Sequence, residues 1–222
     1  MRTSALVRGT VWALLLVHWS CKREIPLSTD TEPINGFRIE GTVSDGLGRP
    51  LAQVQIRLFY EFIFESNTPE PSRSYALRAS SESVEVRVVD ASNRIIRTVF
   101  SGLVTDSVIT VLWDGRLADG SEAAGGKYTV QYHAGGSERA SYVVLVHGTV
   151  SATSDVNGRF IIPQESLPLA QTGIPLYSLT DQFLGLHATG RRVELELKAG
   201  TTVKSILVNV EENFLTRVNV VL

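Results

Sequence analysis

The chain has 222 residues, of which 43% are hydrophobic and 20% charged, and its net charge is −2. This length suffices for one or two domains with a buried core. The near-neutral charge argues against the basic surface of a nucleic-acid-binding protein, and the apolar content excludes a disordered chain. The 18 glycines and 8 prolines favour strands and turns over long helices.

The first 20 residues have the features of an export signal. Arg2 and Arg8 supply positive charge, and the apolar run 11–17 follows them. That run is much shorter than the roughly 20 residues that a membrane-spanning helix requires. We therefore expect residues 1–20 to be a signal peptide, and the remaining chain to be exported.

Cys21 is the only cysteine, and it lies between Ser20 and the polar pair Lys22–Arg23. This segment resembles the lipobox of bacterial lipoproteins, although His18 and Trp19 depart from the usual leucine and small residue. The resemblance implies that Cys21 carries a lipid and anchors the protein in a membrane. A lone cysteine has no internal disulfide partner, and two acyl chains on one residue give stable anchoring. The alternative is an ordinary secretory signal that contains a cysteine.

Residues 21–35 are polar and proline-containing, and we expect them to form a tether. Beyond the tether, apolar and polar residues alternate over 37–43 and again over 54–60. The segment 45–50 between these runs is rich in Asp, Gly and Pro, which predicts a turn and a hairpin of the two strands.

Further short strands are predicted nearly to the end of the chain, with turn signals between them. They cover residues 84–90, 95–100, 108–113, 127–133, 140–150, 159–163, 192–197, 202–210 and 216–222. Residues 167–186 are the least patterned. Short strands at this spacing predict an all-β sandwich or barrel.

Two family resemblances interleave along the chain. Residues 41–51 and 54–58 resemble the start of the carboxypeptidase-regulatory-like domain. The strand that continues this pattern, with Asp155, Gly158 and Phe160, comes much later. The resemblance implies a transthyretin-like β-sandwich.

The segment between these two parts resembles the Ig-like domain of flagellar hook-capping proteins. The resemblance rests on 84–90, on Leu112-Trp113-Asp114-Gly115 and on the strand after Gly125-Gly126, a pair that we interpret as a turn. It implies that Trp113 packs in the sandwich and that Asp114-Gly115 shapes a turn.

These resemblances predict two β-sandwich modules, Ig-like and transthyretin-like, with one inserted in the other. The host comprises 36–66 and 149–222, and the insert comprises 72–148. Long insertions in a surface loop cost little closure entropy. The alternative is two domains in tandem, divided near residue 148.

No set of residues indicates chemistry. His133, His147 and His187 are scattered without metal-ligand spacing, and no residue is predicted to be catalytic, to bind a cofactor or to bind a metal. Carboxylates in predicted turns are either calcium ligands or, more simply, turn formers; they are Asp45, Asp114, Asp119 and Asp155.

The run 59–64 is strongly aromatic and immediately precedes the predicted insert. Its aromatic side chains either seal the joint between two sandwiches or form a surface patch for a partner. Under the second interpretation the possible partner contacts are Tyr60, Phe62 and Phe64.

The resulting hypothesis is a non-enzymatic bacterial lipoprotein of the cell envelope. It would serve adhesion, scaffolding or assembly, without a cofactor, bound to the membrane by its N-terminal lipid and to other envelope or extracellular proteins but not to nucleic acid. Its expected location is the outer membrane or cell surface, with the periplasmic side as an option. The alternative function is a surface glycan- or ligand-binding protein accessory to a transporter or secreted enzyme.

Overall fold

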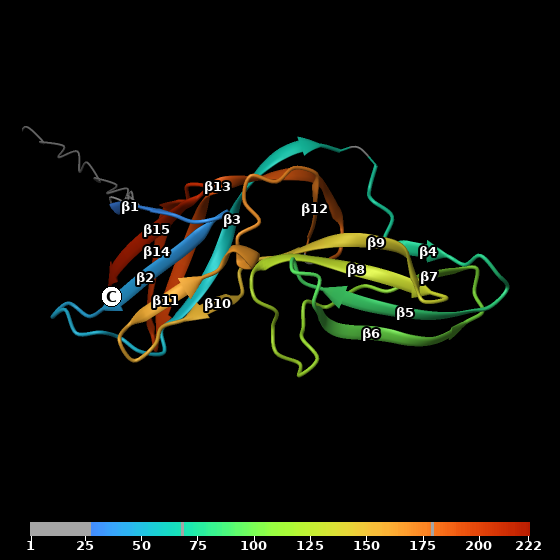
Figure 1. Cartoon of the computed structure of the whole chain (residues 1–222), viewed down its shortest axis with the longest axis horizontal. Helices are drawn as coiled ribbons and strands as arrows, with labels where there is room; N and C mark the ends of the chain where they lie inside the picture. Colours follow the sequence, from blue (N-terminus) through green and yellow to red (C-terminus); the bar gives the residue numbers. More distant parts are fainter. Residues whose placement is uncertain (1–27, 68, 179) are drawn as a thin grey trace, which may run out of the picture.

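The computed structural model describes residues 28–67, 69–178 and 180–222, and Figure 1 shows that nearly all of them lie in strands or in the turns between strands. The predicted all-β fold is therefore confirmed. The predicted signal peptide and Cys21 lie outside the described residues. No helix in the described part of the chain is long and apolar enough to cross a membrane.

The elements follow one another along the chain as short strands with a single turn of 3₁₀ helix among the described residues. They are β1 (Ser28–Pro33), β2 (Arg38–Ser44), β3 (Gln55–Ser66), β4 (Ser74–Ala76), β5 (Glu82–Val89), β6 (Ile95–Val104), β7 (Val108–Thr110), β8 (Gly126–Ala134), β9 (Ser137–Val146), β10 (Val150–Thr153), β11 (Arg159–Ile162), η1 (Gln164–Ser166), β12 (Ile174–Tyr177), β13 (Phe183–Ala199), β14 (Thr202–Asn209) and β15 (Phe214–Val221).

The first sandwich consists of two facing sheets that share one core. One sheet has the order β1-β15-β2-β11, and the other has the order β10-β3-β13-β12, with β14 also paired to β13. The alternating apolar residues of both sheets point inward and are almost completely buried, among them Ile39, Val43, Ile56, Leu58, Leu195, Leu197 and Val220. This burial is the main favourable term that holds the two sheets together.

The predicted hairpin of 37–43 with 54–60 is wrong. β2 pairs with β15 and β11, whereas β3 pairs with β13 and β10, so the two strands lie in opposite sheets. The segment between them carries the chain across from one sheet to the other, with Gln53 in the left-handed backbone region. Alternation identifies the buried face of a strand, but it does not identify the partner of that strand.

A glycine and a phenylalanine fit together inside this sandwich. Gly41 faces inward on β2, and Phe160 lies directly opposite it on β11. A Cβ atom on Gly41 would overlap the ring of Phe160, so the ring occupies the space that a side chain would fill. Gly41 is thus a packing requirement of the core rather than a turn residue.

The second sandwich is built from the chain between β3 and β10. Its main sheet has the order β6-β5-β8-β9, and the small sheet β4-β7 covers it. The predicted pairing of 84–90 with 95–100 is confirmed by the β5–β6 ladder. The core is a separate cluster that includes Tyr75, Val84, Val86, Val88, Trp113, Val130, Tyr132 and Tyr142.

Strand β7 is shorter than the predicted 108–113 because side chains replace its ladder partners. The N–H of Val111 donates to the hydroxyl of Tyr132 at 2.9 Å, and its carbonyl accepts from the hydroxyl of Tyr142 at 2.7 Å. The chain can then leave the sheet and place Trp113 in the core, where the ring is 8% exposed.

The least patterned region, 167–186, contains part of an extension that we call the arm (62–66, 174–177 and 183–189). In the arm, the end of β3 and the start of β13 pair beyond the sandwich, and β12 joins them at the edge. Figure 1 shows the arm directed toward the second sandwich, with β12 near β9.

Insertion of 72–148 into a host of 36–66 and 149–222 stays a prediction, and the pairing pattern supports it. β10 and β11 follow the second sandwich in the chain, yet they pair with β3 and β2, which precede it. Each sandwich also has its own buried cluster. A tandem arrangement divided near residue 148 would not produce these crossed pairings.

We predict that residues 72–148 expressed alone unfold in one cooperative transition, because all buried members of the second core lie between Tyr75 and Tyr142. Circular dichroism and the fluorescence of Trp113 should change together in urea. A matched fragment, 72–136, lacks β9 and Tyr142 and should not fold. An unfolded 72–148 fragment would contradict the proposed boundary.

Candidate functional site

The acidic residues weighed as calcium ligands form hydrogen bonds inside their own turns. Oδ1 of Asp45 accepts the N–H groups of Leu47 and Arg49, both at 2.9 Å, and Oδ1 of Asp155 accepts those of Asn157 and Arg159, both at 2.8 Å. Asp114 and Asp119 accept the N–H two residues onward in the same way. These carboxylates act as turn formers. Among the described residues, no group of three or more His, Cys, Asp and Glu is placed to hold a metal ion.

Three of the turns have one design that sequence reasoning missed. Each begins with Asp (45, 90 or 155), places Gly or Asn in the left-handed region three residues later, and continues with Arg. In each turn the Asp oxygen accepts two backbone N–H groups. The visible signal is the spacing Asp-x-x-Gly/Asn-Arg. Gly and Asn suit this spacing because both tolerate positive φ.

Hydrogen bonds also set the charge state of these carboxylates. Partial burial alone would raise the pKa of Asp90, but the backbone N–H and guanidinium of Arg94 and the N–H of Ser92 lower it on balance. The backbone N–H of Arg49 lowers the pKa of Asp45 in the same manner. Both turns therefore keep a negative carboxylate that binds its own loop.

The aromatic run on β3 passes from the core to the surface. Tyr60 is 6% exposed and its hydroxyl donates to the carbonyl of Ser166 at 2.9 Å, so Tyr60 is a core residue rather than a surface contact. Burial raises the pKa of the Tyr60 hydroxyl. Phe62 is partly buried against the same core, whereas Phe64 is 55% exposed. Phe64 is thus the one of the three predicted contacts whose ring is largely open to solvent.

Two of the scattered histidines come together around this run. The rings of His147 and His187 approach Phe62 edge-on, with centroids 5.2 and 6.2 Å away, and His187 also contacts Phe64 at 5.5 Å. Desolvation lowers the pKa of His147, which favours the neutral ring. Packing on aromatic rings explains this pair without a ligand.

The two sandwiches meet closely at what we call the junction. It comprises residues 123–125 and 147–151 and, on its other side, Arg73. Its shortest connection, 147–149, lies between β9 and β10. There, the hydroxyl of Thr149 donates to the carbonyl of Ala123 at 2.8 Å, and the N–H of Gly125 donates to the hydroxyl of Ser151 at 3.1 Å. A Cβ on Gly125 would lie 2.8 Å from Oγ of Ser151 and 3.1 Å from the hydroxyl of Tyr60. Gly125 is therefore required for close approach, not for the predicted turn.

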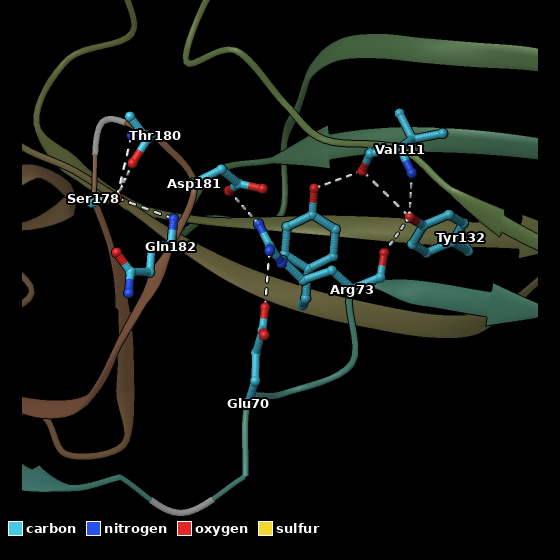
Figure 2. Close-up of polar contacts among 9 residues, drawn as sticks. Glu70, Arg73, Val111, Tyr132, Ser178, Thr180, Asp181 and Gln182 are labelled. Carbon is cyan, nitrogen blue, oxygen red and sulfur yellow. Dashed lines mark hydrogen bonds and ion pairs between the residues drawn. The ribbon is translucent and has the colours of Figure 1, made fainter.

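Arg73 links the sandwiches on the other side of the junction. Its carbonyl accepts the hydroxyl of Tyr132, a residue of the second core, at 2.7 Å. Its guanidinium donates to Asp181 at 2.6 Å and to Glu70 at 2.9 Å, and it lies 4.0 Å from the ring centroid of Tyr177. Figure 2 shows the side chain of Arg73 between these two carboxylates. Arg73 thus connects the second core to the arm of the first sandwich.

Asp181 is held in place by a local turn between β12 and β13, the two strands that form part of the arm. The hydroxyl of Ser178 accepts the N–H groups of Thr180 at 3.2 Å and Gln182 at 3.1 Å, and the backbone of Asp181 is left-handed. Figure 2 shows this turn facing Arg73. A preformed acceptor loses less entropy when it binds a guanidinium. Sequence reasoning missed this cluster because nothing local joins residues 73 and 181.

We predict an energetic coupling between Arg73 and Asp181. Arg73→Met removes the charge but keeps the stem, and Asp181→Asn keeps a residue that tolerates positive φ. Because the side chain of Arg73 is only 16% exposed, the double-mutant cycle should give about 1 kcal/mol, above the value for most surface pairs. Urea denaturation of the four proteins measures it. The exposed pair Arg191–Glu212 is the control and should give less; equal couplings would refute the special role.

Comparison with known proteins finds a similarity to a family over most of the second sandwich. Residues 66–138 match the family model described as the FlgD Ig-like domain. The basal-body rod modification protein FlgD of Escherichia coli (strain K12) is 31% identical over 83 residues, which cover 35% of this chain and 36% of the relative. The chain thus spans about a third of the relative's length. No solved structure gave a significant match.

The match confirms the predicted resemblance to the Ig-like domain of hook-capping proteins, and the structure explains its residues. Nε1 of Trp113 donates to the carbonyl of Arg116 at 2.8 Å, and the ring packs on Tyr128 at 4.9 Å between centroids. Gly115 has a positive φ in the turn. The signature residues are therefore structural. The matched region ends within β9, which pairs with β8 along the whole strand and completes the sheet.

Proposed function

We propose that this chain is a non-enzymatic lipoprotein of the bacterial cell envelope, anchored through Cys21, that acts as a structural and interaction module in adhesion, scaffolding or assembly. The observation that carries the proposal is the match of 66–138 to the FlgD Ig-like domain. The relative is named for modification of the basal-body rod. We transfer only this general role in assembly, since fold similarity alone does not fix function.

The junction supports a scaffolding role. Hydrogen bonds, a partly buried cation–π contact and close glycine packing join the two sandwiches at several places. A module held in this way presents its surfaces in a fixed direction, whereas a flexible linker would not. We also propose that the first sandwich is a carboxypeptidase-regulatory-like domain with a transthyretin-like fold. Its role would be to support the inserted module.

The anchor is tested by Cys21→Ser in the native host. We expect wild-type protein to sediment with membranes and to incorporate labelled fatty acid, because two acyl chains hold a protein stably on a bilayer. The variant should be soluble and unlabelled. Cys21→Ala serves as a second variant, since both changes remove the thiol. Wild-type protein that incorporates no labelled fatty acid, or a variant that is labelled as strongly as wild type, would contradict lipid anchoring.

Phe64 is the proposed contact for a protein partner, and it also separates the two candidate functions. A photo-crosslinking amino acid at Phe64 should give discrete protein adducts in intact cells, because a 55% exposed aromatic ring gains from burial at an interface. The same probe at Val108, which is 49% exposed on β7, is the control. Adducts to glycan instead of protein would favour the alternative, a surface glycan-binding protein.

A further inference from the structure

The end of the first sandwich that lies away from the second sandwich carries two unusually exposed apolar side chains. Leu47 and Val156 are each 80% exposed, more than the other large apolar residues of the described chain. Each lies near the apex of an Asp-x-x-Gly-Arg turn, 45–49 or 155–159, and we call these two turns the tip loops. Figure 1 places the C-terminus at this same end.

The tip loops lie side by side. The N–H of Val43 donates to the carbonyl of Gly158 at 2.8 Å, and a Cβ on Gly158 would meet Leu51 and Pro50 at 3.2 Å. Each turn is closed by two backbone N–H bonds to its own aspartate. Leu47 and Val156 therefore lie on two preformed turns whose bases adjoin, and neither side chain belongs to the buried core. Isolated exposed apolar residues are common and need no explanation, but two of them on neighbouring preformed turns indicate a surface that binds a partner or a membrane.

β1 begins at Ser28, which is the end of this strand nearer to the tip loops. Ser28 pairs with Arg217 in an antiparallel ladder, and β15 continues from Arg217 to Val221, which lies beside Ser44 and the first tip loop. That distance along the strand is about 13 Å. Cys21 precedes Ser28 by seven residues, whose greatest reach is about 25 Å. A lipid on Cys21 therefore lies within reach of the tip loops.

The charges at this end suit a lipid surface. Segments 44–55, 153–159, 198–204 and 220–222 contain four basic side chains and two acidic ones. The acidic residues are engaged within their turns, and Arg49 pairs with Asp45 at 2.6 Å. Lys204 lies next to the end of β15, where it donates to the carbonyl of Val221 at 2.6 Å. Apolar side chains next to basic ones are typical of surfaces that bind an anionic membrane interface.

We propose that the tip loops are a second membrane contact, in which Leu47 and Val156 insert into the headgroup region of the bilayer that holds the Cys21 lipid. This inference rests on the proposed anchoring. With an anchor and a tip contact together, the first sandwich would have one orientation on the membrane and the second sandwich would face away from it.

The experiment attaches the chain to vesicles without depending on acylation in cells. Residues 21–222 contain one thiol, so Cys21 can be coupled to a maleimide lipid in vesicles of phosphatidylethanolamine and phosphatidylglycerol (3:1). Leu47→Trp reports the tip, and Leu103→Trp, at a 69% exposed position on β6 of the second sandwich, is the matched control. Brominated lipid should quench the added fluorescence of Leu47→Trp and leave that of Leu103→Trp unchanged.

A second measurement removes the contact. For uncoupled protein, Leu47→Asn with Val156→Asn should lower partitioning onto the same vesicles about tenfold, because two apolar side chains lose their burial. Leu103→Asn should have no effect. Urea denaturation checks that each variant folds, as expected for exposed positions.

The outcomes separate this inference from the anchoring proposal. Equal quenching of both tryptophan reporters, or none at Leu47→Trp, overturns the tip contact even if Cys21→Ser shows that the protein is lipid-anchored in cells. Quenching at Leu47→Trp supports the tip contact even if the cellular experiment rejects acylation. Self-association of the free protein that the double variant abolishes would assign the tip to a second copy of the chain and overturn the membrane contact.

Discussion

The first sandwich depends on hydrogen bonds between parts of the chain that the whole second sandwich separates. Ser154 is 1% exposed and lies at this meeting point. Its hydroxyl accepts the N–H of Val54, 100 residues away, and donates to the carbonyl of Leu51, while its backbone exchanges bonds with Gln53 and Val54. Both sheets are completed only when β10 and β11 reach β3 and β2. These pairings need the ends of the second sandwich to lie close together, as domain termini often do. Contacts of such sequence separation also predict slow folding.

Sequence alone predicted most of the strands but not all of their neighbours. It missed β12, and it missed β1, because residues 28–33 belong to the segment 21–35 that was expected to be a tether but pair with β15. Alternation located β2, β3, β5, β6, β8 and β14 because half-buried strands alternate by physical necessity. It failed for the partners of β2 and β3, since every strand of a sandwich has the same pattern. The arm was not predicted because the pairing of β13 with β3 shifts register between Thr189 and Val193, which interrupts the alternation of buried and exposed residues. Trp113 was placed correctly in the core because family resemblance supplied information that periodicity lacks.

The junction shows the same limit for function. Arg73 looked like one charged residue in a proline-containing loop, yet it contacts Tyr132, Tyr177 and Asp181 from three separate elements. From the sequence, Tyr60 could face the core or a partner, with the core favoured; its burial and its hydrogen bond to Ser166 place it in the core. Local sequence patterns cannot predict such tertiary contacts, because the contacting residues lie on different parts of the fold. The need for glycine at position 125 could not be predicted for the same reason. A side chain there would clash with Ser151 and Tyr60, which are distant in sequence.

The paired connections between the sandwiches have a mechanical consequence. Tension between the second sandwich and the N-terminal end would enter the first sandwich through β3 and β10, which lie side by side in one sheet. Because the pull runs along these strands, the ladder bonds from β3 to β13, a strand that is not itself pulled, would be loaded together, in shear, rather than opened one after another. Resistance to force is governed by the rate of unfolding rather than by equilibrium stability. A protein with this connectivity would unfold slowly under load, and β3 and β10 would share the applied force.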